Sequence, residues 1–248
     1  MGIWNLFSSS KSSASRITDL SVLKTDIHSH LIPGIDDGSK DIENSIELIT
    51  SLHELGYQKL ITTPHIISDS YRNTPEIILR GLEIVREAVR KQNIPVEIEA
   101  AAEYYVDFEF QNKIGKEKLL TFGDNYLLFE VSYLNPPENL EKVIFELQME
   151  GYKPILAHPE RYPFWYHTDQ YEKFKERGIL FQMNINSLTG YYSLKTKKVA
   201  EQLIDKGMID FLGTDCHHMG HISLLNKVGH EKHLHKILMS GKLLNQSI

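Results

Sequence analysis

The sequence contains only one cysteine, Cys216, among its 248 residues, so no disulfide can form within the chain. A chain of this length buries most of the surface that its unfolded state exposes, and it does not need disulfides to remain folded. Lack of disulfides is typical of a reducing compartment, and we therefore expect a cytoplasmic protein.

The sequence also lacks long hydrophobic runs and an excess of positive charge. No apolar run reaches the roughly 20 residues that a membrane-spanning helix needs, so we expect no stable membrane insertion. Lysine and arginine number 27 against 33 aspartate and glutamate residues, which gives a formal net charge of −6. This balance argues against a nucleic-acid-binding protein, because phosphate contacts require a basic face.

The first residues of the chain carry little that predicts structure. The apolar piece Ile3–Phe7 is too short for a signal peptide, and no basic residue precedes it. A serine-rich stretch follows. We predict a flexible leader over residues 1–22 and a single domain over residues 23–248, because no linker or internal repeat interrupts the later sequence.

Short apolar runs alternate with helical patterns throughout this domain. Helical spacing of apolar residues covers 42–55, 75–91, 138–149, 169–177 and 194–206. The runs with the length and hydrophobicity of buried strands are 23–30, 57–65, 96–105, 126–133, 152–158, 179–186 and 209–217. Strands that alternate with helices form parallel sheets through right-handed crossovers. The pattern predicts an α/β fold with a closed or nearly closed parallel barrel, and an open doubly wound sheet is the alternative.

Residue types that bind metal ions recur where the predicted strands end. The set is His28, His30, His65, Glu103, His158, Asp215 and His217. The C-terminal ends of parallel barrel strands meet on one face, where the active site lies. His28 and His30 are two residues apart, so their side chains point the same way in a strand, and the same holds for Asp215 and His217. Any one of these histidines alone would more often be a polar loop residue, and it is their combination that indicates a metal site.

Imidazole and carboxylate ligands together suit manganese, iron and zinc. Glu103 could bridge two ions, as carboxylates do. Ions a few Å apart polarise a phosphoryl oxygen, lower the pKa of a water between them and stabilise the leaving oxygen. The residues therefore predict a metal-dependent phosphoesterase that uses water directly and forms no covalent phosphoenzyme.

The order of these motifs resembles the polymerase and histidinol phosphatase (PHP) superfamily. The opening block, TDIHSHLIPGIDDGS at 25–39, is similar to that of the bacterial metal-dependent protein-tyrosine phosphatases that accompany capsule and exopolysaccharide synthesis. Further matching blocks are TTPH at 62–65, YRNT at 71–74, AEYY at 102–105, HPERY at 158–162 and TDCH at 214–217. The resemblance covers the chain from Leu23 to about Leu244.

This resemblance implies a distorted TIM-like (β/α)7 barrel with two to three divalent metal ions, for which we expect Mn²⁺, with iron or zinc as alternatives. It adds Asp37 to the metal ligands. By position, the first ion would be held by His28, His30, Glu103 and Asp215, the second by Glu103 with His65 or His158, and the third by Asp37, His65 and His217. Arg161 and Asp215 would be the catalytic residues.

The resemblance also implies a substrate and its contacts. The substrate would be a tyrosine-phosphorylated protein, such as the C-terminal tail of a bacterial tyrosine kinase that controls exopolysaccharide or capsule synthesis. Arg161 would clamp the phosphate through its planar guanidinium. The family carries a second arginine a few residues beyond the last Asp-x-His, but residues 218–222 contain none. Either Arg72 or a histidine substitutes for it, or the substrate is held more weakly.

Two other functions are compatible with parts of the pattern, and a third is excluded. A phosphatase for a small metabolite such as histidinol phosphate would share the metal ligands. A non-catalytic, metal-bound module that binds a kinase is a second alternative, but mere binding would not require so complete a ligand set. A cysteine-dependent tyrosine phosphatase is excluded, because that class needs an arginine six residues after its cysteine, where this chain has Ile222.

Overall fold

The computed structural model describes residues 19–248. Residues 1–18 of the leader predicted over 1–22 therefore lie outside the described residues. The 3₁₀ helix η1 (Leu20–Leu23) follows, with the side chain of Asp19 accepting a hydrogen bond from the backbone N–H of Ser21. Leu20 and Leu23 are both buried. Residues 19–22, which the prediction assigned to the leader, are thus part of the fold.

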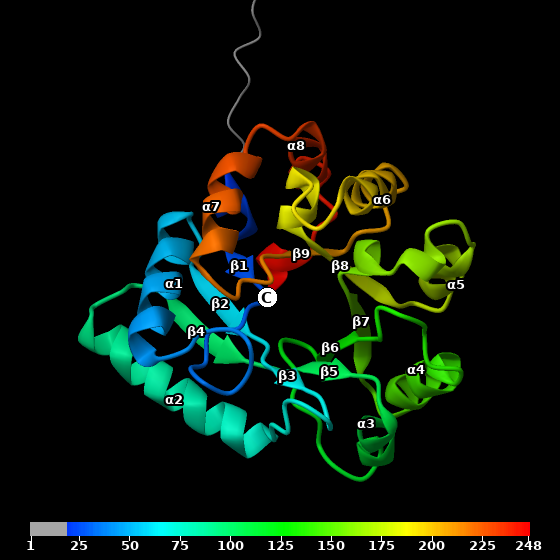
Figure 1. Ribbon diagram of the computed structural model, residues 1–248, viewed down its shortest axis with the longest axis horizontal. Helices are drawn as coiled ribbons and strands as arrows, with labels where there is room; N and C mark the ends of the chain where they lie inside the picture. The colour runs from blue at the N-terminus through cyan, green and yellow to red at the C-terminus, as the bar shows by residue number, and fades with distance from the viewer. Residues whose placement is uncertain (1–18) are drawn as a thin grey trace, which may run out of the picture.

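Parallel strands form the centre of the molecule, and Figure 1 shows them arranged around its middle. They are β1 (Thr25–Asp26), β2 (Lys59–Thr62), β3 (His65–Ile66), β4 (Glu97–Ala100), β5 (Glu103–Tyr105), β6 (Tyr126–Glu130), β7 (Lys153–Ala157), β8 (Leu180–Asn184) and β9 (Phe211–Gly213). They belong to two sheets, with the orders β1-β2-β4 and β3-β5-β6-β7-β8-β9. Each pairing between these strands is parallel.

The two sheets continue one another around a ring. β2 leads into β3 through Thr63 and Pro64, and β4 leads into β5 through two alanines. Proline cannot donate a ladder hydrogen bond, which accounts for the break after β2. The pairing resumes at once, because the Glu103 N–H donates to the carbonyl of Pro64 at 3.1 Å. At the other seam the His30 N–H donates to the carbonyl of Cys216 at 3.0 Å, which joins the segments that follow β1 and β9.

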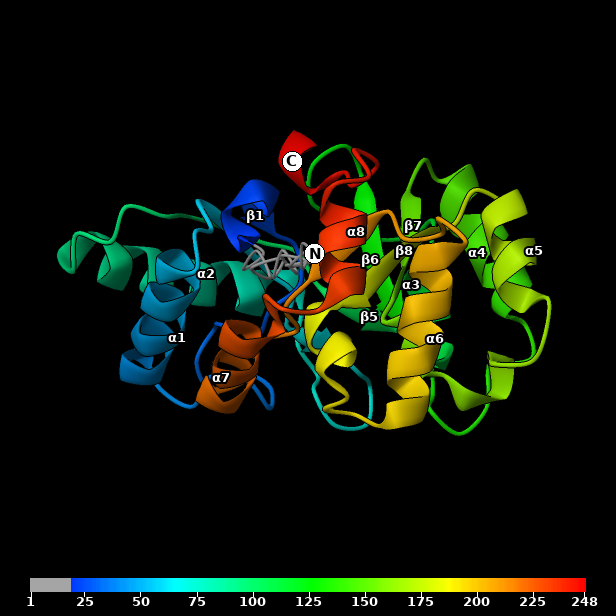
Figure 2. The same ribbon diagram turned by 90° about the horizontal axis from the view of Figure 1, so that it is seen from above.

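The helices cover the outside of this ring, as the two views in Figures 1 and 2 show. They are α1 (Ile42–Glu54), α2 (Pro75–Lys91), α3 (Phe108–Lys113), α4 (Leu140–Met149), α5 (Gln170–Glu176), α6 (Leu194–Asp205), α7 (Met219–Val228) and α8 (Lys232–Leu238). Short 3₁₀ helices η2 (Pro159–Arg161), η3 (Pro163–Trp165), η4 (Ile185–Thr189) and η5 (Asn245–Ser247) lie in the connections. α1 and α2 begin where side chains cap them, at Asp41 and at Thr74 before Pro75.

Apolar side chains from several strands fill the inside of the ring. Ile27, Ile61, Leu128, Ile155 and Phe211 form part of one buried cluster. This cluster is distinct from the larger one in which helices and strands pack together. The ring is therefore a packed core, and the side chains beyond the strand ends rest on it. The predicted parallel α/β architecture is confirmed, although its strands are divided between two sheets. Within residues 19–248, no helix is long and apolar enough to cross a membrane.

Candidate metal centre

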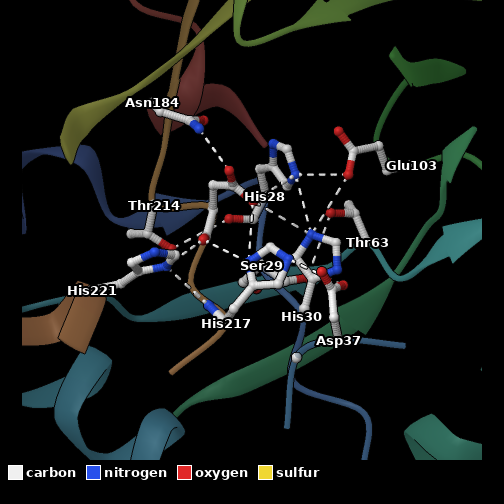
Figure 3. A network of polar contacts seen from close by, with 12 residues as sticks. His28, Ser29, His30, Asp37, Thr63, Glu103, Asn184, Thr214, His217 and His221 are labelled. Carbon is white, nitrogen blue, oxygen red and sulfur yellow. Dashed lines mark hydrogen bonds and ion pairs between the residues drawn. The ribbon is translucent and has the colours of Figure 1, made fainter. Parts of the chain in front are cut away.

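The C-terminal ends of the strands bring the predicted metal ligands together in one cluster (Figure 3). Its members follow β1, β2, β4, β7 and β9, which are far apart in the sequence. A cavity of about 760 Å³ opens above the cluster and is lined by Asp37, His65, Glu103, His158, Asp215 and His217. His28 and His30 are fully buried beneath it. The prediction that these residues meet at one face is therefore confirmed by the geometry.

Hydrogen bonds fix the orientation of the two innermost imidazoles. Nδ1 of His28 lies 2.7 Å from Oε1 of Gln182, and Nδ1 of His30 lies 2.8 Å from Oδ2 of Asp36. Both oxygens are acceptors, so each Nδ1 carries the hydrogen. The Nε2 atoms then face each other at 3.3 Å. In neutral imidazoles these atoms would present two lone pairs to the same point, which is the arrangement that a shared cation stabilises.

Glu103 lies at the middle of the cluster. Its Oε2 is 3.2 Å from Nε2 of His28, 3.6 Å from Nε2 of His30 and 3.1 Å from Nδ1 of His65. Its Oε1 is 3.0 Å from Nε2 of His158. Oε2 is buried and has no hydrogen-bond partner of good geometry within residues 19–248. A carboxylate with imidazole nitrogens on both oxygens can contact ions on either side of it.

Asp215 completes the innermost group. Its Oδ1 lies 3.4 Å from Nε2 of His28 and 3.5 Å from Nε2 of His30. Its other oxygen accepts a hydrogen bond from Nδ2 of Asn184 at 2.6 Å. Asn184 in turn accepts from Nε2 of Gln182, the residue that holds His28. One hydrogen-bonded chain therefore orients both an imidazole and a carboxylate of the cluster.

A second group lies closer to solvent. Oδ1 of Asp37 is 3.5 Å from Nε2 of His65 and 3.4 Å from Nε2 of His217. Nδ1 of His217 lies 2.9 Å from the carbonyl of Asp215, so its Nε2 is free to face Asp37. Together with His30, these side chains offer ligand atoms that all lie within 4.8 Å of one another. Asp37, which entered the prediction only through the resemblance, is thus part of the cluster.

Glu130 is a cluster residue that the sequence interpretation missed. It ends β6 and is buried, with Oε1 at 3.2 Å from Nδ1 of His65 and Oε2 at 3.8 Å from Nε2 of His158. His65, Glu103 and Glu130 form a third group that could hold an ion. The available signal was weak, because the run predicted as a strand extends over 126–133 and places Glu130 inside it, whereas β6 ends at this residue.

Two glycines allow the backbone to approach the cluster. A Cβ atom on Gly38 would lie 2.4 Å from Cβ of His30, so only glycine lets the 33–39 loop close over that histidine. A Cβ atom on Gly213 would lie 2.8 Å from Cβ of His28. His158 and Asp215 themselves adopt left-handed backbone conformations, with φ of 34° and 50°. Such conformations are uncommon for these residues and tend to occur at functional sites.

The electrostatics of the cluster reveal an excess of negative charge. Burial lowers the pKa of His28, but the charges of Glu103 and Asp215 outweigh burial and raise that pKa to about 9. Burial also opposes the shift at His65, where Glu103 and Glu130 raise the pKa to about 12. Without other cations, the carboxylates would keep these imidazoles protonated. Divalent cations can replace those protons, so this donor set fits metal ions.

Arg161 lies at the wall of the same cavity. Its Nη1 is 3.3 Å from Oδ2 of Asp215. The rings of Tyr133 and Tyr192 flank the guanidinium, with their centroids 4.7 Å and 4.2 Å from its central carbon. A guanidinium between two rings loses little freedom when it binds an anion. The predicted position of Arg161 beside the ligands is confirmed.

The structure does not bring Arg72 to this cavity. Arg72 lines a neighbouring cavity, and its Nε donates to the carbonyl of Ser68 at 2.8 Å. The histidines that follow the last motif, His218 and His221, line the first cavity instead. Nδ1 of His221 lies 2.9 Å from the carbonyl of Asp215, against the backbone that presents that carboxylate. A histidine is therefore better placed than Arg72 to stand where the resemblance expects an arginine.

Comparisons with known proteins identify similar sequences. Residues 24–224 match the family of capsular polysaccharide synthesis proteins CpsB/CapC. The tyrosine-protein phosphatase YwqE of Bacillus subtilis is 29% identical over 202 residues, covering 78% of this chain and 77% of that protein. The putative tyrosine-protein phosphatase CapC of Staphylococcus aureus is 26% identical over 194 residues, covering 77% of this chain and 76% of that protein.

A solved structure has a similar fold. It comes from work on YwqE of Bacillus subtilis and CpsB of Streptococcus pneumoniae, which are described as unique metal-dependent tyrosine phosphatases. It superposes on this chain with a TM-score of 0.77 and 26% identity, covering 90% of this chain and 94% of the other. An amidohydrolase from Mycoplasma synoviae, with a TM-score of 0.50 and 16% identity, shares the fold alone.

Proposed function

Because the chain belongs to the CpsB/CapC family of capsular polysaccharide synthesis proteins, we propose that it is a metal-dependent phosphatase that hydrolyses phosphotyrosine on proteins. The observation that carries the proposal is the cluster beneath Arg161. There, the Nε2 atoms of His28 and His30 converge with Oε2 of Glu103 at the strand ends. The relatives described above are themselves tyrosine-protein phosphatases by name, which supports the same reaction.

We assign the ligands by the three groups of side chains. His28, His30, Glu103 and Asp215 would hold the innermost ion. Glu103 would be shared with a second ion, whose other ligands would be Glu130 with His65 or His158. Asp37, His65 and His217 would hold the third. Two to three divalent cations are expected, and the mixed nitrogen and oxygen ligands favour Mn²⁺, with iron or zinc as alternatives. When bound, these cations supply an activated water and compensate charge on the phosphoryl oxygens.

The chain's own residues then position the substrate. The guanidinium of Arg161 can meet two phosphoryl oxygens at once, and Tyr133 and Tyr192 hold it at the cavity wall. In that position it would counter the negative charge that builds up in the transition state. Asp215, which contacts both the histidines and Arg161, would fix the position of the metal ligands relative to Arg161. Arg161 and Asp215 are therefore our candidates for catalytic residues.

The expected partner is a tyrosine-phosphorylated protein that takes part in capsule or exopolysaccharide synthesis. Our candidate for this partner is the C-terminal tail of a bacterial tyrosine kinase. The cavity supports a protruding phosphorylated side chain as the ligand. It is about 760 Å³ in volume, and its lining includes Tyr105 and Tyr191, of which Tyr191 is 47% exposed. These aromatic rings would contact the ring of phosphotyrosine.

The test is a comparison of substrates with defined metals. A phosphotyrosyl peptide, a phosphoseryl peptide and histidinol phosphate would be offered to the metal-stripped protein with and without added Mn²⁺. We expect the phosphotyrosyl peptide to give the highest kcat/KM, and only when metal is present. Faster turnover of histidinol phosphate would contradict the assignment to proteins, and equal turnover without metal would contradict the assignment of the cluster.

A further inference from the structure

A second cavity adjoins the one above the metal cluster. Its volume is about 630 Å³, close to the roughly 760 Å³ of the first. Ile67 lines both cavities, so the two lie next to each other at this residue. The second cavity is formed by the segment after β3 and by the start of α3. It contains none of the candidate metal ligands.

The wall between the cavities is a short, well-anchored loop. Ile67 and Tyr71 pair across it, with N–O distances of 2.9 Å and 3.0 Å. At its tip, the Ser68 N–H donates to Oδ2 of Asp107 at 3.0 Å. On the catalytic side, the ring of Tyr71 stacks on His65 at 5.6 Å between centroids. Because the loop is held at its base and at its tip, the boundary between the two cavities is fixed.

The lining of the second cavity suits a polypeptide. Ile66 and Phe110 are buried and contribute apolar surface, and Phe108 is 72% exposed. Charged side chains of both signs, including Arg72 and Glu109, complete the lining. Buried apolar side chains together with polar and charged ones are the usual composition of a protein-binding surface. A single exposed phenylalanine is ordinary on a protein surface, but this one lines a cavity that adjoins the catalytic one.

We propose that the second cavity binds the polypeptide segment next to the phosphotyrosine of the substrate, with a large apolar side chain of that segment against Phe108. The inference rests on the proposed function and adds a basis for its selectivity. A small phosphomonoester fills only the first cavity, whereas a polypeptide whose phosphotyrosine occupies that cavity continues over Ile67 into the second.

The experiment separates the two cavities by substrate and by variant. Phe108→Ala removes the exposed ring, and Phe145→Ala is the matched control, since Phe145 is 60% exposed on α4 and lines neither cavity. A second variant, Ser68→Trp, fills the second cavity from the loop. Each protein is loaded with Mn²⁺ and assayed on 4-nitrophenyl phosphate. Two phosphotyrosyl peptides are assayed in parallel, one flanked by leucines and one by serines.

We expect the unmodified protein and Phe145→Ala to prefer the leucine-flanked peptide. Phe108→Ala and Ser68→Trp should lose about fivefold or more in kcat/KM on that peptide, the effect of removing a substantial interface contact. Their turnover of 4-nitrophenyl phosphate should stay within about twofold of the unmodified protein. Equal use of both peptides by the unmodified protein, or equal losses in Phe108→Ala and Phe145→Ala, would overturn the inference. If no phosphorylated substrate is turned over at all, it is the proposed function that fails.

Discussion

The guanidinium of Arg161 lies against Asp215, with 3.3 Å between Nη1 and Oδ2, while the ring of Tyr192 covers its face at 4.2 Å. The same carboxylate faces His28 and His30 through its other oxygen. The candidate phosphate clamp and the candidate metal cluster therefore share one residue. A displacement of Arg161 would alter the position of Asp215 among the metal ligands, and a displacement of Asp215 would alter the position of Arg161.

This relationship predicts a large catalytic effect at Arg161. Arg161→Ala should keep the metals and the fold but lose about 2–4 kcal/mol of transition-state stabilisation, as when one preorganised oxyanion donor is removed. That loss is about a hundredfold or more in kcat/KM. Arg161→Lys should recover little of it, because a point charge cannot meet two oxygens. Steady-state kinetics with elemental analysis would test this, and turnover of Arg161→Ala within about threefold of the unmodified protein would contradict it.

Activity should depend on metal and not on the cysteine. Cys216 is fully buried, and burial raises the pKa of its thiol well above the ordinary value, so it does not form a nucleophilic thiolate. A chelator should abolish turnover and Mn²⁺ should restore it. Cys216→Ser should retain most of the activity and melt at a lower temperature, because it buries a hydroxyl in an apolar place. Full activity in excess chelator would refute this prediction.

Glu130 should prove to be a ligand. Removing a ligand from the group that it forms with His65 and Glu103 leaves an ion under-coordinated. Glu130→Ala should therefore bind less metal per chain and lose activity. Glu43→Ala, which alters an exposed glutamate on α1, serves as the control and should bind as much metal as the unmodified protein. Elemental analysis after dialysis gives the answer, and equal metal content in the two variants would exclude Glu130 as a ligand.

Local signals explain what could be predicted from the sequence. Helix α2 covers Pro75–Lys91, as predicted, because apolar periodicity and the Thr74-Pro75 start coincide there. The first strand is much shorter than the run over 23–30, since only Thr25–Asp26 pairs as a strand. Beyond it the backbone bonds across the seam, as where the Asp215 N–H donates to the carbonyl of His28 at 2.8 Å. Hydrophobic runs reveal buried strands but do not show where their pairing ends.

The site was predictable where motifs or expected strand ends marked the ligands, as the spacing of His28 and His30 does. Glu130 lies inside the run predicted as a strand over 126–133, and only the structure shows that the strand ends at this residue. Gln182 could not be predicted as a residue of the site, for a different reason. It is uncharged, and its role follows from a contact with His28, 154 residues away in the sequence. The position of Arg72 could likewise not be predicted, because it depends on the side of the 67–71 loop from which this side chain extends.

The stability of the protein should fall more steeply with rising pH without metal than with it. Carboxylates, against the effect of burial, raise the pKa values of His28 and His217 to about 9, compared with about 6.5 in an unfolded chain. Without metal, the contribution of these two imidazoles to the free energy of unfolding is complete below about pH 6.5. It is lost as the pH rises towards about 9. With saturating metal, the folded imidazoles are neutral ligands, so this loss of stability with rising pH should disappear. Thermal melts from about pH 6.5 to 8 would reveal this, and identical slopes in chelator and in Mn²⁺ would contradict it.

The last prediction concerns Gln182, which touches no expected ion. Its Oε1 accepts from Nδ1 of His28 at 2.7 Å, and its Nε2 donates to Oδ1 of Asn184 at 2.9 Å, which in turn holds Asp215. Gln182→Leu keeps a similar volume but removes both contacts, so His28 loses the acceptor that fixes its tautomer. Loss of such an outer hydrogen bond typically weakens metal binding by about 10–100-fold.

Gln182→Leu should therefore need a correspondingly higher Mn²⁺ concentration for half-maximal activity, and saturating metal should restore much of kcat. Gln148→Leu, on the surface of α4 away from the cluster, is the matched control and should leave the metal requirement unchanged. A purely structural glutamine would lower the melting temperature without changing the metal concentration at half-maximal activity. Metal titrations of the two variants distinguish these outcomes, because only a residue that acts through His28 is rescued by more metal.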